Sequence, residues 1–129
     1  MDPNLALFAN DAFYVAFENG DFDAMAGLWA RDQVITCMHP GWPALVGREA
    51  VLESWERILG NQSAEPVTAF NARAVIIDRL VNVICYERIA GQTLVATNLF
   101  ALEAGQLRLV HHQAGPCAEP PEPEPRSVQ

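Results

Sequence analysis

The 129-residue chain contains no lysine, because all eight of its basic residues are arginine. It therefore cannot form a lysine Schiff base, anchor pyridoxal phosphate or supply the lysine of a phosphate-binding P-loop. The eight arginines face 16 acidic residues, which gives a formal charge of −8. An acidic surface repels nucleic-acid phosphates and anionic lipids, so we expect the chain to bind neither nucleic acid nor a membrane.

Cysteine and long apolar runs are also scarce. Cys37, Cys85 and Cys117 are too few and too scattered for a disulfide framework, which favours a reducing compartment. No apolar run approaches the roughly 18 residues that a membrane helix needs. Residues 1–4 lack the basic flank of a secretory signal. The sequence therefore predicts a cytoplasmic protein.

The composition divides the chain into a body and a tail. Hydrophobic residues make up 50% of the chain, which at this length is enough for one core. We expect one domain over residues 1–117. Residues 118–129 alternate proline and glutamate with almost nothing to bury, which predicts an extended or disordered tail.

Helical spacing is confined to the first half of the chain. Apolar residues recur at intervals of three and four in a first segment that predicts a helix over 4–18. Asp21 can cap a short second helix. A third amphipathic segment follows Gly47 and ends at Gly60. The sequence thus predicts three helices before residue 61.

Strand-like patterns dominate the second half. Residues 34–39 predict a first short strand, and four longer segments follow at 67–78, 81–89, 93–102 and 106–113. The connections between the four are short enough for hairpins, which predicts antiparallel pairing. The expected fold class is α+β, with three N-terminal helices packed against a strongly curved, mostly antiparallel sheet that forms a cone with a pocket.

Several short segments occur in a recognisable order. They are residues 13–17 (FYVAF), 20–25 (GDFDAM), 28–30 (LWA), 37–42 (CMHPGW), 47–51 (GREAV), 54–55 (SW), 96–100 (ATNLF) and 107–113 (LRLVHHQ). Over about residues 5–116 this order resembles the SnoaL-like branch of the nuclear transport factor 2-like superfamily. The resemblance implies a cone-shaped fold. It leaves function open, because such folds include isomerases, dehydratases, cyclases and proteins that only bind or dimerise.

The last predicted strand carries two adjacent histidines. Strict alternation places His111 on the same face as Leu107 and Leu109, and His112 on the opposite face. The first face is the more apolar, so we expect His111 to point into the cone. His112 would then face the outer surface, where these folds commonly dimerise. The alternative is that both imidazoles are hydrogen-bonded structural groups.

Acid or base catalysis in such a cone needs a titratable side chain inside it. The candidates for the base are His39, His111 and Glu87, with Tyr14 as a hydrogen-bond donor. Glu87 shares strand parity with Val83 and Cys85, which permits burial. An ion pair of Glu87 with Arg73 or Arg88 is the alternative.

Aromatic and amide side chains supply the candidate ligand contacts. The predicted pocket lining is Tyr14, Trp29, Trp42, Trp55, Asn98, His111 and Gln113. Trp29 and Trp55 lie on helix faces that can equally form the core. Trp42 stands in a Pro-Gly-Trp-Pro loop, which favours the cavity mouth. Cys37 and His39 have an unspecific spacing for a metal, so we expect neither a metal nor a cofactor.

Three functional hypotheses remain at this point. The preferred one is a homodimer, joined through the outer sheet face, in which each chain binds a small apolar molecule. The second is an isomerase, hydratase or dehydratase, or cyclase that acts on an apolar carbonyl compound by general acid and base catalysis. The third is a subunit whose outer sheet face docks a partner protein.

Overall fold

The computed structural model describes residues 1–61 and 66–125, and within them the chain forms three helices and six strands. The helices are α1 (Pro3–Asn19), α2 (Phe22–Leu28) and α3 (Arg48–Gly60). The strands are β1 (Thr36–Met38), β2 (Leu45–Val46), β3 (Val67–Ile77), β4 (Leu80–Ile89), β5 (Gln92–Glu103) and β6 (Gln106–Pro116). The predicted helices and long strands are confirmed. The short strand β2 was not predicted.

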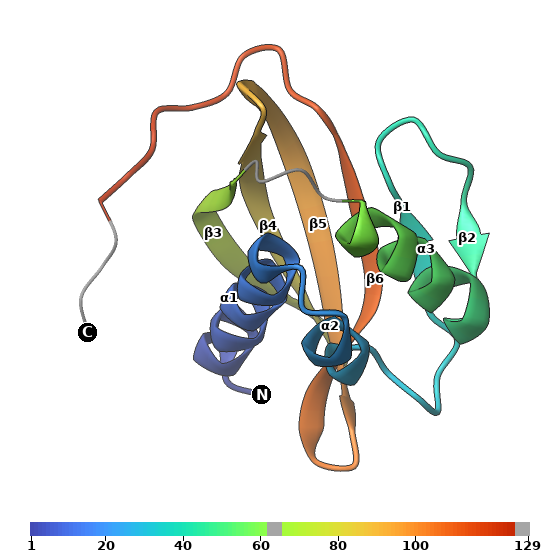
Figure 1. Cartoon of the computed structure of the whole chain (residues 1–129). Coiled ribbons are helices and arrows are strands. Elements are labelled where there is room, and N and C mark those ends of the chain that lie inside the picture. Colours follow the sequence, from blue (N-terminus) through green and yellow to red (C-terminus); the bar gives the residue numbers. More distant parts are fainter. Residues whose placement is uncertain (62–65, 126–129) are drawn as a thin grey trace.

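The six strands form one open sheet in the order β2-β1-β6-β5-β4-β3. β1 pairs parallel with β6, and every other neighbouring pair is antiparallel. Figure 1 shows α1 and α2 on the concave side of the long strands, with α3 beside β1 and β2. The α+β class and the mostly antiparallel curved sheet are therefore confirmed.

Local signals fix both ends of the first helix and the start of the second. Asp2 caps α1 by accepting a hydrogen bond from the Asn4 amide at 2.9 Å. Gly20 ends α1 with φ at 65°, a left-handed conformation that glycine adopts without strain. Asp21 then caps α2 through the Ala24 amide at 3.1 Å, as predicted.

Aromatic side chains from the helices fill the space beneath the sheet. Phe13 packs edge-on against Trp55, with ring centroids 5.4 Å apart, and Trp55 packs in the same way against Phe17. Trp29, which caps the end of α2, bridges to Leu109 of β6 and is fully buried. Trp29 and Trp55 therefore belong to the core.

A β-bulge in β6 overturns one prediction. Leu99 of β5 pairs with His111, but the next residue, Phe100, pairs with Leu109, so Val110 is an extra residue in β6. The extra residue resets the alternation of inner and outer side chains. Leu109 and His112 therefore share the inner face although they lie three positions apart. His112 is buried and His111 half-buried on the other side. The prediction that His111 points inward and His112 outward is wrong.

The described part of the tail is held at one point on the sheet. Asn71 lies at a bulge of the edge strand β3, where φ is 54°. Its side-chain amide donates to the Glu122 carbonyl at 3.0 Å, and its oxygen accepts from the Glu124 amide at 2.7 Å. Two such bonds contribute about 2 kcal/mol in total. Asn71 thus anchors residues 122–124.

Replacing Asn71 with alanine is expected to release this anchor. In the parent protein the Glu122 and Glu124 amides should show the order parameters of rigid backbone, about 0.85, by ¹⁵N relaxation. In Asn71→Ala they should fall below about 0.6, because the variant lacks both bonds. Asn4→Ala, an exposed asparagine on α1, is the matched control. Unchanged order at Glu122 in the Asn71 variant would contradict the anchoring role.

Candidate functional site

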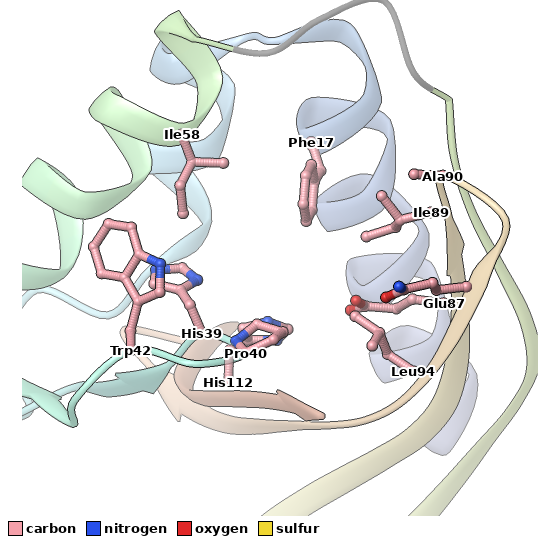
Figure 2. Close-up of a pocket in the computed structure, with 11 residues that line it drawn as sticks. Phe17, His39, Pro40, Trp42, Ile58, Glu87, Ile89, Ala90, Leu94 and His112 are labelled. Carbon is pink, nitrogen blue, oxygen red and sulfur yellow. The ribbon is translucent and has the colours of Figure 1, made fainter. Parts of the chain in front are cut away.

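A cavity of about 380 Å³ opens between the helices and the sheet (Figure 2). Its lining residues are Phe17, His39, Pro40, Trp42, Ile58, Glu87, Ile89, Ala90, Gln92, Leu94 and His112. Most of this lining is apolar. The titratable groups stand on facing sides, with Glu87 on one and His39 and His112 on the other, as Figure 2 shows. A volume of this size suits a small molecule.

Glu87 supplies the carboxyl side of the cavity. The regular alternation of β4 turns it inward with Val83 and Cys85, and it is 1% exposed. The Tyr14 hydroxyl, presented by α1, donates a hydrogen bond to Glu87 Oε2 at 2.5 Å. Burial raises the pKa of Glu87 to about 7, although the Tyr14 hydrogen bond acts in the opposite direction. The carboxyl group is therefore about half protonated at neutral pH.

The alternative, an ion pair of Glu87 with Arg73 or Arg88, is not seen among the described residues, because both arginines are exposed and Glu87 is buried. Arg88 instead donates to the Thr93 hydroxyl at 3.1 Å, on the solvent side of the sheet. Tyr14 is the hydrogen-bond partner of Glu87, and burial together with the Glu87 charge raises the pKa of Tyr14 well above its ordinary value. Tyr14 therefore remains a neutral donor while Glu87 titrates.

His39 stands at the end of β1 between two indole rings. Its centroid lies 5.0 Å from Trp42 and 4.8 Å from Trp55, both in edge-on contacts. Ser54 donates its hydroxyl proton to the Val51 carbonyl at 2.6 Å, so its oxygen accepts from His39 Nε2 at 2.9 Å. Burial lowers the pKa of His39 to about 4. His39 is therefore a neutral imidazole whose Nδ1 carries the lone pair.

His112 is the second imidazole of this side. It is 1% exposed, and its ring centroid lies 6.2 Å from that of His39. Its Nδ1 lies 2.6 Å from Asn98 Oδ1. Burial, with smaller contributions from His39 and His111, lowers the pKa of His112 to about 3. Two uncharged imidazoles therefore face a half-protonated carboxyl group across an apolar cavity.

The predicted site residues divide into three groups. His39, Glu87 and Trp42 line the cavity, and Trp42 stands at its mouth with 37% of its surface exposed. Tyr14 and Asn98 are buried behind the lining and hydrogen-bond to it. The remaining four predicted contacts do not line the cavity: Trp29, Trp55, His111 and Gln113.

The physical reasons differ among these four. Trp29 and Trp55 are core side chains, with no surface exposed. The bulge at Val110 turns His111 and Gln113 to the outer face, where Gln113 is exposed and His111 Nδ1 lies 2.6 Å from Thr36 Oγ1. The pocket contacts predicted for these residues are wrong. The residue that sequence reasoning missed is His112, and no feature of the sequence marks Val110 as the extra residue.

The metal-binding side chains of the described ranges 1–61 and 66–125 do not form a cluster. Cys37 Sγ lies 3.6 Å from His39 Nε2, but no group of three metal-binding side chains forms there. Burial raises the pKa of Cys37 to about 12, which disfavours the thiolate that a metal requires.

In the same described ranges, 1–61 and 66–125, no helix is long and apolar enough to span a membrane.

Comparison with known proteins establishes the family. A family model described as the SnoaL-like domain matches residues 7–119. The chain belongs to the SnoaL-like family. Among the solved structures that resemble this SnoaL-like chain, some are described as nuclear transport factor 2-like and others as cystatin-like in fold, which agrees with the open curved sheet described above.

Two solved structures combine close fold similarity with sequence identity above 30%. One, from Streptomyces avermitilis, is described as a "putative dehydratase from the NTF2-like family"; it is 32% identical, with a TM-score of 0.83, over 92% of this chain and 97% of that one. The other, from Thiobacillus denitrificans, is described as a "putative calcium/calmodulin-dependent protein kinase type II association domain". It is 33% identical, with a TM-score of 0.77, over 84% of this chain and 92% of that one.

A curated protein of Arabidopsis thaliana, the F-box protein SKIP8, is also similar to this SnoaL-like chain. The two are 23% identical over 107 residues, which make up 81% of this chain. The match spans only 46% of the plant protein. The similarity therefore concerns one part of that protein.

Proposed function

We propose that this SnoaL-like protein binds a small, largely apolar, uncharged carbonyl compound and catalyses the addition or loss of water by general acid and base catalysis. One observation carries the proposal: a carboxyl group with a pKa of about 7 faces two neutral imidazoles across an apolar cavity. Near neutral pH the Glu87 carboxyl group can therefore donate a proton while the imidazoles are unprotonated, which is the protonation pattern that paired acid and base roles require. Similarity to the S. avermitilis protein supports the dehydratase direction.

The lining of the cavity supports an uncharged substrate. No arginine is among the lining residues of the described chain, so a carboxylate or phosphate would enter without a counter-charge. Phe17, Ile58, Ile89 and Leu94 offer apolar contact instead. The polar groups suit a carbonyl oxygen and a hydroxyl group held at facing sides.

The loss of water from a β-hydroxy carbonyl compound needs no cofactor. An imidazole lone pair, on His112 or His39, takes the proton from the carbon next to the carbonyl. The electron pair of that C–H bond forms the new carbon–carbon double bond, and the bond from carbon to the hydroxyl oxygen breaks. Tyr14 occupies Glu87 Oε2, so Glu87 donates its proton from Oε1 and the hydroxyl leaves as water.

We also propose a cytoplasmic homodimer joined through the outer sheet face. The outward side chains Val75, Ile77 and Val95 are 37%, 49% and 36% exposed, which leaves apolar surface on that face. Similarity to an association domain from T. denitrificans favours an assembling chain. The dimer would leave the cavity untouched, because the cavity opens on the inner side of the sheet (Figure 2).

A screen of uncharged β-hydroxy ketones tests the catalytic proposal. Turnover is followed by the ultraviolet absorbance of the conjugated product, and binding by protection of Trp42 fluorescence from acrylamide. Glu87→Gln and His112→Gln should each lower kcat by roughly 10²- to 10⁴-fold, since a positioned acid or base contributes about that much. The rate should also fall as pH rises through about 7, because Glu87 then loses the proton it donates.

His111→Gln is the matched control, because the same substitution falls on the neighbouring histidine outside the cavity. Its turnover should equal that of the parent protein. If ligands protect Trp42 from quenching but none is turned over, the enzyme proposal is rejected and the protein is a binding protein. Full activity in folded Glu87→Gln would reject the assigned acid.

A further inference from the structure

A chain of hydrogen bonds behind the cavity joins its two polar sides. His112 Nδ1 lies 2.6 Å from Asn98 Oδ1, and Asn98 Nδ2 donates to the Tyr14 hydroxyl oxygen at 3.2 Å. Tyr14 in turn donates to Glu87 Oε2 at 2.5 Å. Asn98 is the central member of this chain and has no exposed surface. The imidazole and the carboxyl group are therefore connected through a single amide.

The neighbours of Asn98 determine which way its amide points. Its nitrogen faces two oxygens, Asn10 Oδ1 at 2.8 Å and the Tyr14 hydroxyl. The reverse orientation would place Asn98 Oδ1 against those oxygens, and the single proton of Tyr14 is already donated to Glu87. Unpaired buried oxygens are unfavourable, so the amide nitrogen faces Asn10 and Tyr14 and the amide oxygen faces His112.

This orientation determines the tautomer of His112. The amide oxygen of Asn98 can only accept a hydrogen bond, so His112 Nδ1 must carry the ring proton. A neutral imidazole has one N–H group, which leaves Nε2 with its lone pair. His112 lines the cavity, so the lone pair is the group that a bound molecule can use.

We propose that Asn98 is a positioning residue that holds His112 as the Nδ1–H tautomer, with Nε2 as the base, while directing the Tyr14 hydroxyl onto Glu87. This inference rests on the proposed acid and base function and extends it to a residue that touches neither the cavity nor the substrate. Asn98 donates with one end of its amide and accepts with the other, so both sides of the cavity depend on it.

The neutrality of the amide matters as much as its orientation. A carboxylate at position 98 would stabilise the protonated imidazole and raise the pKa of His112. The other titratable groups around His112 are Cys37, its partner on β1, His39 just after β1, the adjacent His111 and, across the cavity, Glu87. With asparagine in place, His112 remains unprotonated at neutral pH, as a base must.

Long-range ¹H–¹⁵N spectra of the imidazole rings test this assignment without any substrate. The chain has three histidines, so His39→Gln, His111→Gln and His112→Gln assign every ring. In the parent protein His112 should carry its proton on Nδ1. In Asn98→Leu, which lacks the acceptor, more than half of His112 should carry it on Nε2. Asn82→Leu, on the outer face of β4, is the matched control and should keep the parent tautomer.

Asn98→Asp provides a second variant in case the leucine variant does not fold. It keeps an acceptor, so His112 should remain protonated on Nδ1 while its pKa rises by about 1 to 3 pH units. A parent protein with His112 protonated on Nε2, or an Asn98→Leu variant with the parent tautomer, would overturn the inference. If the parent protein turns over substrate while His112 is protonated on Nε2, this role of Asn98 is rejected and the proposed reaction stands. If His112 is protonated on Nδ1 but no substrate is turned over, the proposed reaction is rejected and the role of Asn98 in setting the tautomer stands.

Discussion

Replacing His112 with glutamine is expected to remove much of the protein's sensitivity to acid. Burial lowers the pKa of His112 from 6.5 to about 3. Between these values the unfolded chain binds a proton that the folded protein does not. The stability contributed by the neutral imidazole is therefore complete above pH 6.5 and lost as pH falls toward 3. The full loss is about 5 kcal/mol, at about 1.4 kcal/mol per pH unit.

Urea unfolding at pH 7 and pH 4.5 measures this effect. Over that interval His112 accounts for a loss of about 3 kcal/mol, which His112→Gln should not show. Glutamine can still donate to Asn98, so the variant keeps the buried contact without the titration. His111→Gln serves as the control because His111 is only half-buried. An equal drop in the free energy of unfolding for parent and His112→Gln would contradict the low pKa of His112.

Replacing Glu87 with glutamine should act in the opposite direction. Burial raises the pKa of Glu87 from 4.5 to about 7, so the folded protein retains a proton that the unfolded chain releases between these values. Stability is therefore highest below pH 4.5 and falls as pH rises through 7, by up to about 3 kcal/mol. Glu87→Gln lacks the charge, so it should be free of this loss.

The free energy of unfolding of Glu87→Gln minus that of the parent should consequently be larger at pH 8 than at pH 4.5, by up to about 3 kcal/mol. Chemical unfolding at the two pH values gives both differences. Glu56→Gln, an exposed glutamate on α3, is the control and should show no such change. A constant difference between Glu87→Gln and the parent across this range would mean that Glu87 titrates as an ordinary surface carboxylate.

The two effects partly cancel in the parent protein. From pH 4.5 to 6.5 the neutral state of His39 and that of His112 each make stability rise with pH, whereas Glu87 makes it fall. One of the two histidine contributions is therefore offset by Glu87. The parent should still lose stability in acid, and single variants are needed to separate the groups.

The sequence predicted the elements of the fold because each obeys a local rule. Helical spacing gave α1 and α3, Asp21 gave the start of α2, and short connections gave the antiparallel hairpins. The strand β2 spans two residues, too short for any periodicity. Its pairing with β1 depends on the tertiary structure, so it could not be predicted from local pattern.

Strand parity predicted the inward position of a side chain correctly where the alternation of the strand is regular. Glu87 lies on β4, whose inner and outer residues alternate without interruption, and parity placed it inside. The same reasoning failed on β6, because the extra residue Val110 shifts every later side chain to the opposite face. The sequence predicts Asn98 and Tyr14 as ligand contacts, but their burial behind the lining depends on distances that spacing does not encode.

The central claim is that Glu87 is a half-protonated acid facing neutral imidazoles at physiological pH. Titration of the Glu87 side-chain carboxyl carbon by ¹³C NMR, assigned with Glu87→Gln, tests it most directly. The account predicts a midpoint near pH 7. A midpoint near the ordinary value of 4.5 would show a carboxylate that is ionised throughout the neutral range, and the proposed acid would be lost.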